Sequence, residues 1–338
     1  MKKSIFLGTL AAAGLMAGVA SAGTLEDVQA ADVLKCGIGT GNAGFGAPNA
    51  EGYWEGLDVA VCRAVAAAVL KDKDKVEFIP LTSKVRFSAL GSREVDMLSR
   101  TTTWTFSRDV DLGFTFLGVN YYDGQAFIVS KELGVSSALE LDGTTVCITS
   151  GTTTELNLAD YFRSNGMTFD PVPIETRVEA AAQLQAGACD VFTADGSALA
   201  SARSTFEDPD AWTILPEIIS KEPLGPVVRQ GDEQWGDVVR WSLNALIAAE
   251  ELGITRDNID EMLAGTSNPS INRLLGTEGG LGEMLGLDDG WAARAIAANG
   301  NYGEIFADTI GEDTIIGLPR GLNALWTEGG LMYAPPFR

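Results

Sequence analysis

One stretch of the chain, residues 95–109, combines residue types that bind anions. It reads VDMLSRTTTWTFSRD, in which three threonines follow an apolar segment and Arg108 lies three residues after Thr105, an expected helix start. A guanidinium forms two parallel hydrogen bonds with a carboxylate, and hydroxyl and backbone N–H groups complete such a site. We therefore expect Arg108, Thr101 and Thr103 to bind a small carboxylate. The alternative is a surface ion pair of Arg108 with a nearby aspartate, beside threonines that only cap and extend the backbone.

Two segments in the second half of the chain carry complementary groups. Residues 150–154, SGTTT, lie between a strand pattern and a helix pattern, so the hydroxyl of Thr152 or Thr153 could contact an anion. The alternative there is an ordinary helix N-cap. Asp195 ends an apolar strand, where ligands of open α/β sheets bind, and an unpaired carboxylate there would suit an ammonium group. The alternative is an Asp-Gly turn. Arg108 and Asp195 on opposite sides of a cleft would match the charges of an α-amino acid.

A glycine motif near the N-terminus resembles a nucleotide-binding fingerprint. Gly39, Gly41 and Gly44 have the GxGxxG spacing and follow a strand pattern. The fingerprint requires a helix to begin there, whereas further glycines and a proline follow instead. We therefore expect a loop that approaches a ligand and carries Phe45.

The chain is strongly acidic and contains no histidine. Its formal charge is −22, and removal of the first 22 residues with their two lysines brings the charge to −24. Such a surface repels nucleic acid and anionic lipid, so we expect neither as a partner. The lack of histidine excludes Ser-His-Asp and Cys-His catalysis and removes the commonest metal ligand. We expect no metal and no cofactor, and an enzyme would have to use carboxylates or lysine.

The N-terminus has the pattern of a secretory signal. Lys2 and Lys3 precede an apolar run from Ile5 to Val19, and Ala20-Ser21-Ala22 supplies the small residues of a cleavage site. We expect cleavage after about Ala22 and a periplasmic protein. The remaining residues, about 316 of the 338, suit two domains better than one.

Four cysteines, an even number in an exported chain, predict disulfides. Four cysteines allow three connectivities. We favour Cys36–Cys62 and Cys147–Cys189, because each pair joins neighbouring elements of the same half of the chain. No two cysteines have CxxC spacing, which argues against zinc.

Strand and helix patterns alternate along the chain. Alternation of this kind predicts mostly parallel sheets with helices on both faces. The alternation restarts at Asp142, which predicts two similar α/β units. The expected elements of the first unit are strands Val33–Ile38, Val76–Leu81 and one ending at Leu98, with helices Leu57–Leu70 and Arg86–Gly91; those of the second are strands Thr145–Thr149, Pro171–Ile174 and Cys189–Ala194, with helices Ser150 to about Arg163 and Arg177–Gln185.

Extended segments are expected to connect the two units. Phe114–Gly118 and Tyr121–Val129 lead out of the first unit, and Trp212–Leu215 with Val227–Arg229 fit a return crossing. Two crossings form a hinge on which two lobes can close. An amphipathic helix over Trp235–Glu251 follows, and the Gly-rich tail behind it carries aromatic residues that favour packing.

Four segments resemble the extracytoplasmic amino-acid-binding proteins of ABC importers, the family 3 solute-binding proteins. They are GLDVAVCRAVAAAV from Gly56, the hydroxyl run ending in SRD, SGTTTEL, and CDVFTADGSAL from Cys189, in family order over roughly residues 32–250. The ending IGLPRGLNALWTEGGLMYAPPFR makes the chain most similar to the general L-amino acid binders of Gram-negative bacteria. Arg100 replaces a small residue found in many relatives.

This resemblance implies a two-lobed periplasmic-binding-protein fold of type II that closes on one amino acid. Lobe one would comprise residues 23–120 and 221–338, with an extension from about 252, and lobe two residues 121–220. Arg108 and the threonines before it would bind the α-carboxylate, and Asp195 the ammonium group. Thr152 or Thr153 would bridge the lobes, and Phe45 would pack against the ligand side chain.

Two functions of different classes follow from these expectations. The first is a monomeric receptor that captures L-amino acids and delivers them to an ABC-type membrane permease. The alternative is a periplasmic dehydratase-like enzyme that acts on a carboxylic acid on the same scaffold, which would need a carboxyl proton donor in the cleft. A secreted adhesion module fits the disulfides but leaves the facing Arg and Asp unexplained.

Overall fold

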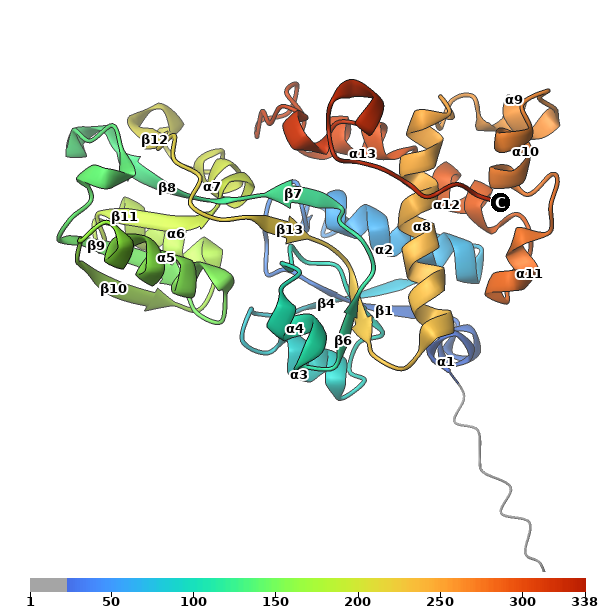
Figure 1. Ribbon diagram of the computed structural model, residues 1–338, viewed down its shortest axis with the longest axis horizontal. Coiled ribbons are helices and arrows are strands. Elements are labelled where there is room, and N and C mark those ends of the chain that lie inside the picture. The colour runs from blue at the N-terminus through green and yellow to red at the C-terminus, as the bar shows by residue number, and fades with distance from the viewer. Residues whose placement is uncertain (1–22) are drawn as a thin grey trace, which may run out of the picture.

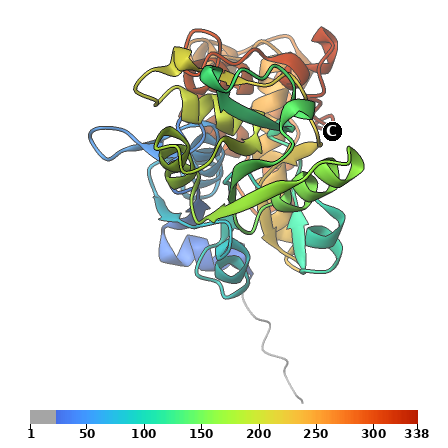
Figure 2. The ribbon, with the colours of Figure 1, turned by 90° about the vertical axis from the view of Figure 1, so that its left-hand side faces the viewer.

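The computed structural model describes residues 23–338, and the expected signal, residues 1–22, lies outside this part of the chain. The chain folds into two α/β lobes, each built on a five-stranded sheet (Figure 1). Lobe two lies in front of lobe one in Figure 2. Across residues 23–338, no helix combines the length and the apolar character that a membrane crossing requires.

The sheet of lobe one has four strands that run in one direction and one, β14, that runs against them. β1 pairs in parallel with β4 and β5, whereas β14 is antiparallel to β5 and β6. The strands in sheet order are β4 (Val76–Pro80), β1 (Leu34–Ile38), β5 (Met97–Leu98), β14 (Val227–Arg229) and β6 (Phe114–Phe116). Lobe one also contains the short pair β2 (Ala47–Pro48) and β3 (Trp54–Glu55), and helices α1 (Thr24–Ala31), α2 (Leu57–Leu70), α3 (Arg86–Gly91), α4 (Phe106–Val110) and α8 (Glu233–Glu251).

Lobe two repeats the arrangement on a smaller scale. β9 pairs in parallel with β10 and β11, and β8 is antiparallel to β11 and β12. The strands in sheet order are β10 (Phe169–Ile174), β9 (Thr144–Thr149), β11 (Val191–Asp195), β8 (Gln125–Ser130) and β12 (Trp212–Ile214). The helices are α5 (Thr153–Ser164), α6 (Arg177–Gln185) and α7 (Gly196–Arg203).

Two antiparallel strands connect the lobes. β7 (Tyr121–Asp123) leads out of lobe one and β13 (Glu222–Leu224) leads back, with Asp123 opposite Glu222. The two crossings expected from the sequence are confirmed, but the return crossing was placed wrongly. Trp212–Ile214 is an edge strand of the second sheet and Val227–Arg229 belongs to the first, so the chain crosses between them.

Each lobe contains one disulfide. Cys36 of β1 is bonded to Cys62 of α2, and Cys147 of β9 is bonded to Cys189, which precedes β11. The structure thus has the pairing that we favoured. Both bonds join a strand to a neighbouring segment of its own lobe, so neither crosses the hinge.

The C-terminal segment packs onto lobe one as a helical extension. Figure 1 shows it in orange and red beside α8. Its helices are α9 (Ile259–Ala264), α10 (Pro269–Leu275), α11 (Leu281–Leu285), α12 (Trp291–Asn299) and α13 (Tyr302–Thr309). α12 packs along α2, which explains why thirteen of the fourteen residues of α2 are buried and not only its valine face. A helix that is apolar on all sides must be covered on all sides.

The extension also contacts the hinge. The side-chain amide of Asn323 accepts a hydrogen bond from the Tyr122 N–H at 2.7 Å and donates one to the Tyr122 carbonyl at 3.1 Å. The hydroxyl of Tyr302 donates to the carbonyl of Asn120 at 2.8 Å. Strand β7 is therefore held to lobe one by side chains from the far end of the chain.

Candidate functional site: a charged cleft between the lobes

Arg108 lies on α4 with its guanidinium buried at the cleft. Thr105 caps this short helix by accepting a hydrogen bond from the Arg108 N–H at 3.4 Å. The side-chain Nη1 donates to the carbonyl of Thr103 at 2.8 Å, and no carboxylate of the described residues lies within ion-pair distance. Burial lowers the pKa of Arg108, which Glu222 and Asp195 partly oppose. The surface ion pair considered as the alternative is absent from this part of the chain.

Thr101 is held in an unusual backbone conformation by a buried carboxylate. Its φ is +49°, in the left-handed region that threonine rarely adopts. Asp58 at the start of α2 accepts hydrogen bonds from the Thr101 N–H at 2.8 Å, from Ser99 Oγ at 3.1 Å and from Asn120 Nδ2 at 3.0 Å. Asp58 therefore positions Thr101, a role that the sequence analysis missed.

The two hydroxyls considered in the SGTTTEL segment have different partners. Thr153 Oγ1 donates to Glu222 Oε2 at 2.8 Å and lies 3.5 Å from Thr103 Oγ1 of the other lobe. Thr152 Oγ1 donates to the carbonyl of Thr149 at 2.7 Å within its own loop. Of the two threonines, the structure brings Thr153 to the lobe interface.

Asp195 ends β11 and is buried, with 3% of its surface exposed. We expected an unpaired carboxylate, but its Oδ2 lies 2.8 Å from Nη2 of Arg177 in the first turn of α6. The long arginine side chain reaches across from the neighbouring helix, so the expectation is corrected. Burial raises the pKa of Asp195, and Arg177 opposes this shift. Nη1 of Arg177 also donates to Thr101 Oγ1 at 2.9 Å, across the lobe interface.

The lobes are in contact across the cleft. Arg86 Nη2 donates to the carbonyl of Gly151 at 3.3 Å, and Lys84 forms a 3.0 Å ion pair with Glu175. Gly151 has a φ of +77°, and a Cβ there would lie 3.2 Å from the Cα of Lys84. Glycine thus permits both the turn and the close approach of the lobes.

A narrow cavity remains between the lobes. It has a volume of about 20 Å³, and its lining includes Ser83, Arg100, Thr101, Thr149 and Arg177. A water molecule needs roughly 10–15 Å³, so an amino acid can enter only when the lobes separate. The structure is therefore a closed conformation.

Phe45 lies on the core side of its loop. Its ring is 1% exposed and packs edge to face on Tyr121, with the ring centroids 5.3 Å apart. The loop residues that line the cavity are Gly39 to Asn42, which precede it. A contact of Phe45 with a ligand side chain stays a prediction, and in the closed conformation the ring supports the loop from behind.

Further charged residues of the cleft were missed by the sequence analysis. Arg86 and Arg177 are each the first residue of a helix, which was the only available signal. Asp123 and Glu222 come from the hinge strands β7 and β13 and are brought beside Asp195 by the crossing. Burial and Asp195 raise the pKa of Asp123 to about 7. Within residues 23–338, no three cysteine or acidic side chains gather as metal ligands.

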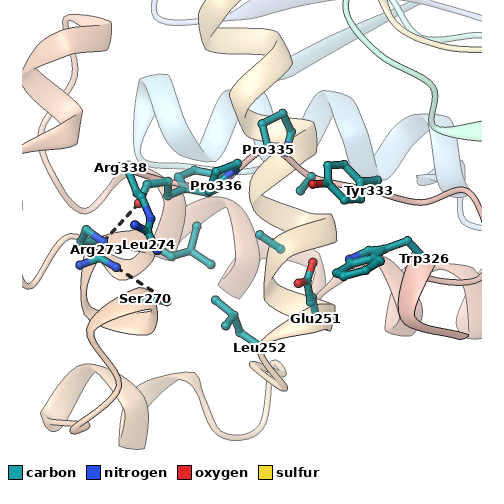
Figure 3. Close-up of a pocket in the computed structure, with 13 residues that line it drawn as sticks. Glu251, Leu252, Ser270, Arg273, Leu274, Trp326, Tyr333, Pro335, Pro336 and Arg338 are labelled. Carbon is teal, nitrogen blue, oxygen red and sulfur yellow. Dashed lines mark hydrogen bonds between the residues drawn. The ribbon is translucent and has the colours of Figure 1, made fainter.

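A second hollow lies outside the cleft. Figure 3 shows it where the last residues of the chain pass α8 and α10. It has a volume of about 210 Å³ and is lined by Arg273, Trp326, Tyr333 and the Pro335–Arg338 terminus, among others. Arg273 Nε donates to the carbonyl of Phe337 at 3.2 Å, which fixes the terminus against α10. This hollow carries no opposed pair of buried charges of the kind found between the lobes.

Two lobes on a two-stranded hinge, with a buried cation and a buried anion at their interface, define a solute-binding protein that closes around its ligand. Comparison with protein families agrees, because residues 34–257 match the bacterial extracellular solute-binding proteins, family 3, and the chain belongs to that family. Its place outside the cytoplasm, expected from the sequence, is confirmed by this membership and by periplasmic relatives.

Relatives match along the whole chain, including the extension. The glutamate/glutamine/aspartate/asparagine-binding protein BztA of Rhodobacter capsulatus is 60% identical, with full coverage of both chains. The general L-amino acid-binding periplasmic protein AapJ of Rhizobium johnstonii is 54% identical, also with full coverage of both. The solved structure of an ABC transporter periplasmic binding protein from Brucella ovis with glutathione bound has a TM-score of 0.92 at 52% identity, covering 94% of this chain and 100% of that one. Amino-acid binding for an ABC transporter, the first of the two expected functions, is confirmed at this level.

Proposed function

We propose that the protein holds one L-amino acid between Arg108 and Asp195 and delivers it to the permease of an ABC transporter. The guanidinium of Arg108 receives the α-carboxylate, assisted by the hydroxyls of Thr101 and Thr103. The carboxylate of Asp195 receives the α-ammonium group, and Thr153 links the lobes beside it. The single observation that carries this proposal is the burial of Arg108 in lobe one and Asp195 in lobe two, close enough for each charge to affect the pKa of the other.

The energetics of closure favour a zwitterion. Water is largely excluded from this interface, so charge-assisted hydrogen bonds to both ends of the ligand are stronger than in bulk solvent. A micromolar dissociation constant requires about −8 kcal/mol. Two bonds to Arg108 and one or two to Asp195, at about 1.5–3 kcal/mol each, can supply this free energy.

The relatives support the same ligand class. BztA is named for glutamate, glutamine, aspartate and asparagine, and AapJ for L-amino acids in general. The Brucella ovis structure contains glutathione, a peptide with an α-amino acid end. We propose in addition that this protein acts as a monomer and as a carrier rather than an enzyme, since its family and relatives are transport proteins.

The experiment is a binding screen on protein that has been unfolded and refolded to remove retained ligand. Melting temperatures are measured with each of the twenty L-amino acids, and calorimetry then gives affinities for those that stabilise the protein. The same ligands with an amidated carboxylate or an acetylated amino group should give no shift. Mass spectrometry should recover the ligand unchanged after incubation. Equal binding of the blocked ligands would contradict the proposed contacts, and turnover would contradict a carrier.

A further inference from the structure

The cleft contains more buried cations than one α-carboxylate needs. Besides Arg108, the guanidiniums of Arg86, Arg100 and Arg177 lie close enough to interact electrostatically. Arg86 is 3% exposed and Arg100 is 6% exposed. Nε and Nη1 of Arg100 and Nε of Arg86 are buried and have no hydrogen-bond partner in the described part of the chain. Donors of this kind are normally paired, because a buried and unpaired charge is destabilising.

The neighbouring carboxylates already have partners of their own. Asp58 is the carboxylate with the largest effect on the pKa of Arg100, but it already accepts three hydrogen bonds from other groups. Asp195 is paired with Arg177, and Glu175 with Lys84. Among residues 23–338, no carboxylate lies within ion-pair distance of Arg86 or Arg100. Glu222 is held by Thr153, Asn157 and Ser220, and Asp123 accepts hydrogen bonds from Gly124 and Ser197.

The guanidiniums of the cluster repel one another. Burial lowers the pKa of Arg86 well below its usual range, and the three other arginines lower it further. Burial and Arg177 lower the pKa of Arg100 to about 9, with Arg108 adding to the shift. An anion that entered among these groups would relieve both the desolvation and the repulsion.

The cluster has a defined position relative to the α-carboxylate. Arg100 and Arg177 line the narrow cavity, together with Ser83 and Thr149, whereas Arg108 is not part of that lining. Ser83 Oγ accepts a hydrogen bond from Arg100 Nη2 at 3.4 Å, so it orients this guanidinium. Thr101 lies between the two regions, since it contacts Arg177 and follows Arg100 in the chain.

We infer that Arg100 and Arg177, supported by Arg86, form a subsite for a second carboxylate, so that the preferred ligands are acidic L-amino acids. This inference rests on the proposed function, because it assumes that the α-carboxylate and ammonium groups are bound by Arg108 and Asp195. A ligand bound in this way bridges the lobes at both ends. Neutral amides of the same length fit the space but leave the guanidiniums without a counter-charge.

The test compares ligand pairs that differ only in charge. Calorimetry at pH 7 measures L-glutamate against L-glutamine and L-aspartate against L-asparagine on refolded protein. We expect the natural protein to bind each acid at least tenfold more tightly than its amide. In Arg100→Met the ratio should fall to within threefold through weaker acid binding, while amide affinity changes less than threefold. Arg100→Lys, which keeps the charge but not the planar donor set, should give an intermediate ratio.

Lys84→Met is the matched control, because Lys84 lies on the same rim but is paired with Glu175 and is not part of the cavity lining. It should leave the acid-to-amide ratio unchanged. Retained amide binding shows that Arg100→Met folds; if that variant does not fold, Arg177→Met must give the same fall in the ratio. Equal affinity of the natural protein for acids and amides would overturn the subsite and leave the proposed function intact. Binding of none of the twenty amino acids would instead contradict the proposed function.

Discussion

Replacement of Arg108 by methionine tests the proposed contact with the α-carboxylate. In the structure one terminal nitrogen of Arg108 already donates to the Thr103 carbonyl, so the remaining donors can form two charge-assisted bonds with a carboxylate. At about 1.5–3 kcal/mol each, their loss costs about 3–6 kcal/mol. The side chain is only 8% exposed, so solvent screening reduces this value little. At about 1.4 kcal/mol per tenfold, calorimetry should show roughly 10²- to 10⁴-fold weaker binding of the amino acid that stabilises the natural protein most.

The empty Arg108→Met protein should melt within a few degrees of the natural protein. The variant loses one hydrogen bond, worth about 1 kcal/mol. It also loses a buried guanidinium without an ionic partner, and removal of such a charge offsets the lost bond. Arg163→Met is the control, because it makes the same change of net charge at an exposed pair with Asp160 on α5. Its affinity should equal that of the natural protein. Binding by Arg108→Met within threefold of the natural value would refute the assigned contact.

Three further predictions concern Asp195, the second disulfide and pH. Asp195→Asn should weaken ligand binding by about 10- to 100-fold in calorimetry, because the ammonium group loses a charged acceptor. The double variant Cys147→Ser, Cys189→Ser should have a free energy of unfolding about 4 kcal/mol lower in urea titrations. The reason is that the disulfide closes a loop with a sequence separation of 42 and so lowers the entropy of the unfolded chain. The pKa of Asp123 is raised to about 7, mainly by burial, so between about pH 4 and pH 7 the folded protein holds a proton that the unfolded chain releases. Stability should therefore fall as pH rises through this window, by up to about 1.4 kcal/mol per pH unit, and Asp123→Asn should remove that slope.

Each of these predictions has an outcome that would contradict it. Unchanged affinity of Asp195→Asn would show that the ammonium group binds elsewhere. The disulfide estimate fails if the double serine variant unfolds at the same urea concentration as the natural protein. For the pH prediction, urea titrations at several pH values give the free energy of unfolding of the natural protein and of Asp123→Asn. The two curves of this free energy against pH should diverge, and parallel curves would show that Asp123 does not titrate in that range.

Most of the fold could be predicted from the sequence because its elements have strong local patterns. The predicted bounds of α2, Leu57–Leu70, agree with the structure, since an Ala- and Val-rich run ends at both sides in residues with positive φ. The hinge strand Glu222–Leu224 was missed. Three residues with a central proline carry no strand signal, and they pair only because the first crossing lies beside them.

The local structure of the candidate site could be predicted where its residues lie close together in the sequence. Arg108 and its threonines lie within a few residues, so their strand and helix cap could be recognised. The pairing of Asp195 with Arg177 and the gathering of Arg86 and Arg100 depend on side chains reaching between elements, which no local pattern encodes. The burial of Phe45 could not be predicted either, because its position in a glycine loop gave no sign that its ring turns into the core, and its contact with a ligand stays a prediction.

Attachment of the C-terminal extension to strand β7 limits where the molecule can bend. Asn323 occupies the backbone donor and acceptor of Tyr122, and Tyr302 occupies the carbonyl of Asn120, so this part of the crossing must travel with lobe one. Rotation of lobe two has to be absorbed beyond Tyr122 and, on the return strand, before Pro223, which lies opposite Tyr122. The last eighty residues thus shorten the part of the hinge that can bend. A shorter hinge restricts the path of opening and keeps the binding groups aligned as the cleft closes.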